Sequence, residues 1–345
     1  MLYAATRNKS DVETAYKTIH QDSTSDGGLF VPFRMPEFTI SEILQLSERS
    51  FGENVAKLLN TFFSSGLTGL DVDFTIGRVP VRMNSISHRI LIAECWHNAQ
   101  WNFKHLIQSL SDRIRTENVG AEATNWVQIA IRIAVLFGIY GMLLKEKQVE
   151  VNTPLDIAIT AADFSAPMSA WYAKKMGLPL GNIICACNAN GSAWDLLHRG
   201  EFTTNAITVK TCTPEADIAV PRNLERLICA TLGYEQTQRY LGCCATGSVF
   251  ALAEEELDAL RTGLFASVIS DDRIQNSIFN VYRTSGYVFS PYSALAYGSL
   301  QDYRAKTGES RNALLFTEKS PSCDVELVAK FMQVDVPEVF RRIGK

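Results

Sequence analysis

The chain has 345 residues, of which 46% are hydrophobic and 20% are charged, and its formal net charge is −4. This composition is that of an ordinary globular protein, and the length suits two or three packed lobes. A slightly acidic chain gives no electrostatic basis for binding nucleic acid. We therefore expect a small-molecule substrate as the partner.

The longest apolar stretch, residues 126–144, is interrupted by Gln128 and Arg132. A membrane span needs about 20 nearly uninterrupted apolar residues, so this stretch predicts a core helix and no membrane partner. The N-terminus lacks the apolar region of a secretory signal. The eight cysteines lack the paired C-x-x-C spacing of a zinc site. No metal site and a reducing, cytoplasmic location are expected.

Residues 1–60 predict a helical lobe with a tight turn at "SDGGLFVP". Within this lobe, "TISE" fits a capping box at the start of a helix. Short β-like runs follow between residues 78 and 93. A helical pattern then begins near Lys104 with "FKHLIQSLSDRI".

After the long apolar helix, residues 155–190 predict a strand, a turn, a helix and a second strand, which together form a βαβ unit. Its turn, "TAADFSAP", follows the carboxyl end of the first strand, where α/β proteins bind ligands. A loop over 199–222, further helices and a final strand in "NALLFTEKS" complete the layout. The predicted fold class is therefore α/β.

The turn of the βαβ unit has the position of a phosphate site but not its chemistry. Backbone N–H groups at a helix N-terminus hold phosphates, and glycines allow the close approach. This turn contains no glycine, and it places Asp163 where the anion would lie. A carboxylate at that position would repel a phosphate.

Several segments, in the same order along the chain, carry a resemblance to a known family. "ATRN" and "DSTSDGGLFVP" are similar to S-T-R-G and D-G-G-L-[FY]-x-P, and "HNAQWNFKH" resembles H-G-P-T-x-x-F-K-D. "AWYAKKMGLPLGNIICACNAN" resembles A-K-K-M-G-L-P followed by a strand and N-x-N, and "TPEADIAVPRNLERLI" resembles A-M-D-I-x-x-P-S-N-F-E-R. These patterns are those of the threonine synthase family, which are pyridoxal-phosphate enzymes of fold type II.

The resemblance implies a fold like that of the tryptophan synthase β subunit, with a three-layer core and a helical N-terminal lobe. It also implies a role for two residues if pyridoxal phosphate is bound. Lys104 would form the Schiff base, and Thr317 would face the pyridine nitrogen.

The departures from the family are concentrated at the cofactor motifs. The family's S-G-N-F-G-N phosphate loop corresponds here to a segment with Ala162, Asp163, Ser165 and Ala166. The Asp after the family lysine is replaced by His105. The family's T-A-H-P-A-K appears as "TEKSPS".

The family's substrate-gripping subdomain, which carries S-G-D-T-G, has no counterpart in the sequence. About twenty residues separate Lys104 from "TNWVQIA", so a lobe of about a hundred residues is missing. We divide the chain into an N-terminal threonine synthase-like lobe, residues 1–90, and a large α/β domain, residues 91–345. The missing subdomain would have lain between about residues 110 and 124.

Three residues are candidate acid–base groups, each with a structural alternative. Lys104 is either a desolvated amine of lowered pKa or a side chain that reaches water. His97 is either an acid–base group or a structural histidine. Asp163 is either a functional carboxylate or a helix cap.

A second set comprises candidate substrate-binding residues. Asn188 and Asn190 are such candidates, although turn hydrogen bonds are the simpler interpretation. His105 follows Lys104, and Ser165 lies in the segment that corresponds to the family's phosphate loop. Trp101 is one of several aromatic residues that either line a cleft or pack in the core.

These observations leave three hypotheses for function. The first is a cofactor-independent enzyme of isomerase, lyase or cyclase type in the former cofactor cleft. The second is a pyridoxal-phosphate-dependent lyase with threonine synthase-like activity, and the third is a non-catalytic pseudoenzyme that binds a ligand or partner. We favour the first, with no cofactor. Because a missing lobe would expose apolar surface, a homodimer is a further hypothesis.

Overall fold

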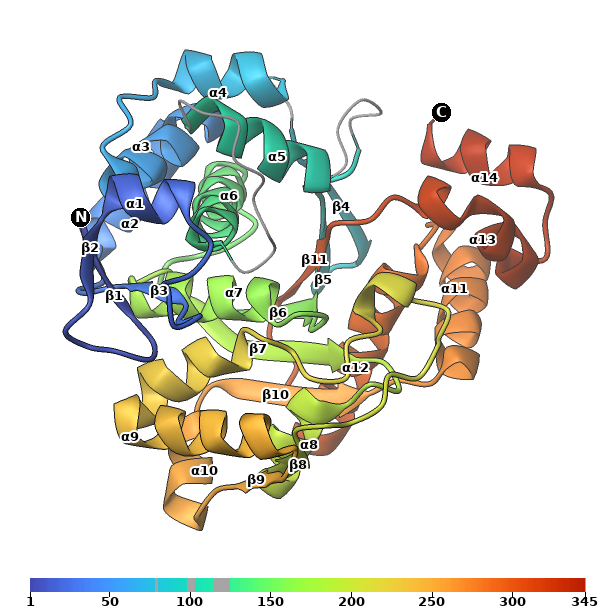
Figure 1. Ribbon diagram of the computed structural model, residues 1–345. Helices are drawn as coiled ribbons and strands as arrows, with labels where there is room; N and C mark the ends of the chain where they lie inside the picture. Colours follow the sequence, from blue (N-terminus) through green and yellow to red (C-terminus); the bar gives the residue numbers. More distant parts are fainter. Residues whose placement is uncertain (78–79, 98–102, 115–124, 345) are drawn as a thin grey trace.

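The computed structural model describes residues 1–77, 80–97, 103–114 and 125–344, and a six-stranded sheet lies at its centre (Figure 1). The strand order is β10-β7-β6-β11-β5-β4, and every neighbouring pair is parallel except β4 with β5. The strands are β4 (Arg82–Ser87), β5 (Ile90–Glu94), β6 (Leu155–Thr160), β7 (Leu180–Cys187), β10 (Leu264–Val268) and β11 (Ala313–Thr317). The predicted α/β fold is confirmed.

Helices cover both faces of this sheet, which makes three layers. Ile157 and Ile159 of β6 pack in one hydrophobic cluster, whereas Ala158 between them packs in the other. This alternation is the period of two that a strand buried on both faces requires. The first cluster includes α3 (Phe51–Phe63), α6 (Trp126–Lys145), α7 (Ser165–Lys175) and α9 (Leu224–Thr246); the second includes α11 (Asp271–Ser285), α12 (Pro291–Thr307), α13 (Val325–Met332) and α14 (Val336–Ile343).

The predicted βαβ unit is present as β6, α7 and β7. Gly177, at φ 101°, ends the unit's helix region and the chain re-enters the sheet parallel to β6. Beyond it lie α8 (Ser192–Arg199), α10 (Glu254–Arg261) and a small sheet of β8 (Glu201–Thr203) with β9 (Val249–Ala251). Two short 3-10 helices, Pro214–Ala216 and Pro321–Asp324, lie in the loops near the carboxyl ends of the strands.

The prediction of a helical lobe over residues 1–60 is wrong in its first half. That half forms an antiparallel sheet of order β2-β1-β3, together with α1 (Ala15–His20). These strands, β1 (Leu2–Ala5), β2 (Val12–Thr14) and β3 (Phe30–Pro32), are three or four residues long, too short to show an alternating pattern. The second half is helical, with α2 (Ile40–Leu44), a 3-10 turn (Gln45–Glu48), α3 and, just beyond it, α4 (Gly69–Ile76). The capping box at Thr39 is confirmed.

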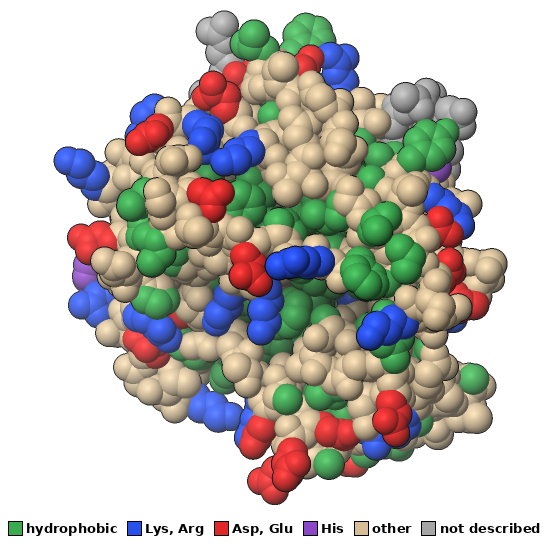
Figure 2. Space-filling view, turned by 90° about the vertical axis from the view of Figure 1, so that its left-hand side faces the viewer, with side chains coloured by type: hydrophobic (Ala, Val, Ile, Leu, Met, Phe, Trp, Pro, Cys, Tyr) green, Lys and Arg blue, Asp and Glu red, His purple; other side chains and the backbone are tan. Residues whose placement is uncertain are grey.

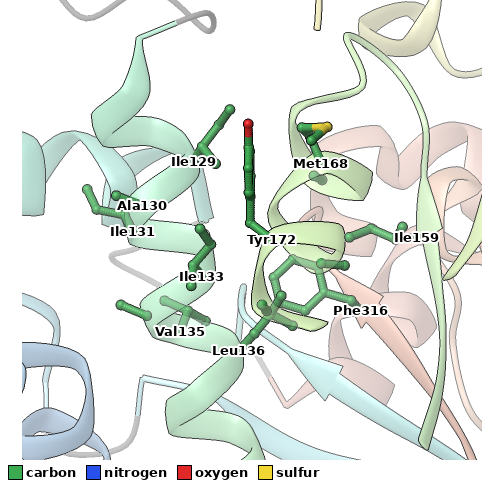
Figure 3. Close-up of a cluster of buried hydrophobic side chains, with 14 of the residues drawn as sticks. Ile129, Ala130, Ile131, Ile133, Val135, Leu136, Ile159, Met168, Tyr172 and Phe316 are labelled. Carbon is green, nitrogen blue, oxygen red and sulfur yellow. The ribbon is translucent and has the colours of Figure 1, made fainter. Parts of the chain in front are cut away.

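Helix α6 lies between the N-terminal lobe and the sheet. It is long and apolar enough to cross a membrane, but 83% of its most apolar window is buried within the protein, as a core helix requires. Figure 3 shows Ile129, Ile133 and Leu136 of α6 pointing toward Tyr172 of α7 and Phe316 of β11.

Two glycines allow α3 and the preceding turn to approach α6 closely. A Cβ on Gly138 would lie 2.7 Å from the Phe51 ring, and one on Gly141 would lie 2.7 Å from the Leu46 carbonyl oxygen. Real Cβ atoms do not approach other atoms so closely, and a backbone carbonyl cannot move aside as a side chain can.

We predict that Gly141→Ala lowers the free energy of unfolding by about 1–3 kcal/mol, because the added methyl group must displace the backbone of the lobe. Gly242→Ala in α9 is the matched control, since a Cβ there meets open space. That change should raise the free energy of unfolding by about 1 kcal/mol through helix propensity. Urea denaturation of both variants measures the two effects, and equal behaviour would contradict the packing described.

Candidate functional site

A cavity of about 320 Å³ lies at the carboxyl ends of β6 and β11. This is the position expected for a ligand in an α/β sheet. Its apolar lining includes Ile107, Ile159, Ile218 and Phe316. Its polar and charged lining consists of Lys104, Gln108, Gln128, Arg132, Thr160, Asp163, Ser165, Glu215, Tyr292, Ser293, Thr317, Glu318 and Lys319.

The turn between β6 and α7 forms one wall and has an unusual backbone. Ala162 has φ 39° and Phe164 has φ 66°, so two residues with side chains adopt the left-handed region. This conformation costs roughly 1–2 kcal/mol for a residue other than glycine. It persists because surrounding contacts hold it: Phe164 is fully buried, and the Asn223 side chain donates to the Asp163 carbonyl at 3.1 Å.

Asp163 closes the N-terminus of α7 with its own carboxylate. Its Oδ1 accepts from the Ser165 backbone N–H at 3.0 Å and from the Ser165 hydroxyl at 2.6 Å. Two residues further on, Pro167 has no N–H to offer. Asp163 therefore caps the helix, from the position before the N-cap residue Phe164, while still facing the cavity.

Lys104 and Thr317 line the same cavity from other elements. Lys104 lies in the first turn of α5 (Phe103–Ile114), and its side chain is exposed, which fits the alternative of a side chain that reaches water rather than a desolvated amine. Thr317 ends β11 and is buried. Its hydroxyl donates to the Ala93 carbonyl at 2.8 Å and accepts from the Trp96 indole N–H at 3.1 Å.

The two candidate histidines do not line the cavity. His97 is half-buried beyond the end of β5, where burial and the nearby Arg82 guanidinium lower its pKa below the ordinary value. His105 is exposed on α5. Trp101 lies outside the residues that the structure describes.

Asn188 and Asn190 are buried in a hydrogen-bond network away from the cavity lining. The Asn188 amide donates to Thr211, Thr213 and Asp217, at 3.0, 2.9 and 2.8 Å. The Asn190 amide donates to the same Asp217 carboxylate at 3.2 Å. Since these bonds fix the loop that reaches Glu215, the network supports the turn interpretation of both asparagines.

Two ion pairs in the cavity lining were not expected from the sequence. Arg132 donates from Nε to Glu318 at 2.9 Å, and Lys319 pairs with Glu215. Burial alone would lower the pKa of Arg132, but the Glu318 carboxylate outweighs it, so the pKa is raised. One signal was present in the sequence, because Arg132 is a lone charge within the apolar pattern of α6.

We predict that Ala162→Gly leaves the free energy of unfolding unchanged or raises it by up to about 1 kcal/mol, because glycine adopts the left-handed backbone without strain. Ala170→Gly, in the buried interior of α7, is the control and should lower that free energy by about 1 kcal/mol. Thermal or urea unfolding distinguishes the two. A loss at position 162 as large as that at 170 would show that Ala162 is not strained.

Comparisons with known proteins agree with this architecture. A family profile described as threonine synthase N terminus matches residues 2–77. Human threonine synthase-like 1 is 26% identical over 180 residues, which cover 51% of this chain and 24% of that protein. Threonine synthase-like 2 from Xenopus laevis is 24% identical over 243 residues, 68% of this chain and 49% of that protein. The matches thus span from a quarter to about half of these relatives.

Solved structures show the same fold. A pyridoxal-phosphate-bound threonine synthase from Brucella melitensis superposes with a TM-score of 0.85 at 16% identity, covering 97% of this chain and 92% of that chain. Yeast threonine synthase gives a TM-score of 0.82 at 15% identity, covering 96% and 90%. The chain is therefore similar to the threonine synthases: residues 2–77 match the profile of their N-terminal domain, and the fold is that of these type II pyridoxal-phosphate enzymes.

Proposed function

We propose that this threonine synthase-like chain uses the cavity as a cofactor-independent site for a small molecule, with acid–base chemistry of the isomerase, lyase or cyclase type. One observation carries the proposal. The carboxylate of Asp163 occupies the N-terminus of α7, where the fold would otherwise place a phosphate.

The phosphate of pyridoxal phosphate does not fit the residues of this turn. It would need backbone donors at the start of α7, but the N–H of Ser165 is bonded to Asp163 and Pro167 has none. It would also bring a second anion against the Asp163 carboxylate, which like-charge repulsion opposes. A methyl group on Ala162 further occupies space that glycine leaves open in phosphate loops.

The cavity retains groups that can move protons without a cofactor. Lys104 supplies an amine from α5, and Asp163 supplies a carboxylate from the β6–α7 turn. One can accept a proton from a bound molecule while the other donates one. Ser165, whose hydroxyl holds Asp163 at 2.6 Å, orients that carboxylate.

The second hypothesis, a pyridoxal-phosphate-dependent lyase, is favoured by a different observation. Lys104 and Thr317, the two positions that the family resemblance ties to the cofactor, both line the cavity. The third hypothesis, a pseudoenzyme that binds a ligand or partner, assigns no chemical role to Lys104.

We predict that the purified protein gains no visible absorbance specific to Lys104 when pyridoxal phosphate is added. Pyridoxal phosphate reacts slowly with any exposed lysine, so bound cofactor should be trapped with borohydride and located by peptide mass spectrometry. Lys104→Ala tests the cavity lysine, and Lys330→Ala on α13 is an exposed control. The wild type, Lys104→Ala and Lys330→Ala should trap similar amounts of cofactor.

A band present in the wild type and in Lys330→Ala, but lost in Lys104→Ala, would contradict the proposal and favour the pyridoxal-phosphate-dependent hypothesis. A cofactor-free protein whose stability to heat is also unaffected by every small molecule screened would instead favour a pseudoenzyme that binds a protein partner.

The expected partners, a small-molecule substrate and a second copy of the chain in a homodimer, remain proposals. The cytoplasmic location is likewise a proposal. On the face shown in Figure 2, hydrophobic side chains lie scattered among charged ones. Leu70 and Phe74 on α4 are 79% and 86% exposed. Sedimentation velocity measures whether the protein forms a dimer.

A further inference from the structure

Arg132 is the most buried cation of the cavity lining. Its side chain is 13% exposed, compared with 17% for Lys319, and Lys104 is exposed. It projects from a helix that carries no other charged residue before Lys145. A guanidinium in such a setting requires a carboxylate or similar anion to offset its desolvation.

The chain itself supplies that carboxylate. Arg132 donates from Nε to one Glu318 oxygen at 2.9 Å, and its terminal NH2 group lies 3.5 Å from the other oxygen. This side-on arrangement is the one in which arginine binds a carboxylate ligand. Glu318 is the more accessible partner, at 27% exposed, and lies in the loop that follows β11.

Arg132 differs from the other two cations of the cavity lining in how far the protein shields it from solvent. Lys319 pairs with Glu215, whose side chain is 57% exposed, and Lys104 is itself exposed. The wall beside Arg132 is apolar, with Ile159 and Phe316. The cavity thus offers a buried guanidinium, paired with a partly exposed carboxylate, beside an apolar surface.

We propose that Arg132 is the recognition residue for a small carboxylate with an apolar body, and that the Glu318 carboxylate occupies the ligand's position on Arg132 until the ligand displaces it. The inference rests on the proposed function of the cavity. The exchange keeps Arg132 paired with one carboxylate throughout, and Glu318 moves from a half-buried position into water. The ligand therefore competes with a tethered anion, which weakens its apparent affinity.

The test uses benzoate as the probe and benzamide, which has the same shape without the charge, as the control. Isothermal titration calorimetry should show that Glu318→Gln binds benzoate about tenfold more tightly than the wild type, if Glu318 holds Arg132 nine-tenths of the time. Arg132→Gln should lose benzoate binding. Benzamide should bind no more tightly to Glu318→Gln than to the wild type.

Thermal unfolding separates recognition from a merely structural ion pair. Glu318→Gln should melt at a lower temperature than the wild type, and benzoate should restore more of its stability than it adds to the wild type. Glu256→Gln, which removes a different ion pair with Arg239, is the matched control and should show no benzoate effect. Loss of stability without rescue, or unchanged benzoate affinity, would overturn the inference.

These outcomes are independent of the cofactor test. Binding of pyridoxal phosphate through Lys104 would refute the proposed function, while a tighter benzoate complex of Glu318→Gln would still assign Arg132 as the anion site.

Discussion

The burial of α6 between the N-terminal lobe and the sheet is the constraint on which the rest of the structure depends. Its two glycines bring α3 and the preceding turn within contact of the helix backbone, while its other face packs on α7 and β11. A helix so tightly enclosed fixes the direction of each side chain. Gln128 and Arg132, one turn apart, therefore both line the cavity.

At the N-terminus of α7, a carboxylate of the protein lies where a ligand anion could bind. The first turn of a helix attracts negative charge, whether from a ligand or from the chain. In this protein the chain provides it through Asp163, and it holds that carboxylate with two hydrogen bonds from Ser165. The same logic recurs across the cavity, where Glu318 satisfies Arg132. Both potential anion sites thus contain a carboxylate of the protein.

The sequence predicts the parts of this structure that local patterns determine. The βαβ unit, the final strand and the capping box at Thr39 all have signals within a few residues. The N-terminal sheet was missed because its strands pair over long distances, such as Tyr3 with Pro32, and each is too short to show a period. Lys104, Asp163, Ser165 and Thr317 all line the cavity, and the roles given to them from the sequence stay predictions.

The rest of the site depends on tertiary contacts that no local pattern records. Arg132 and Glu318 are 186 residues apart, so their pairing is invisible in the sequence even though each is conspicuous alone. The exposure of Lys104 likewise depends on how α5 sits against the sheet, and His97, beyond the end of β5, is not among the residues that line the cavity. The left-handed backbone of Ala162 persists against its residue preference because the βα turn is over-determined by its surroundings.

Phosphorus NMR of pyridoxal phosphate tests whether the Asp163 carboxylate excludes a phosphate from the start of α7. Titration with the wild-type protein should leave the phosphate resonance at its free position and width. Titration with Asp163→Asn, which keeps the hydrogen-bond acceptor and removes the charge, should broaden or shift it. A bound phosphate signal of the same strength with both proteins would contradict the account.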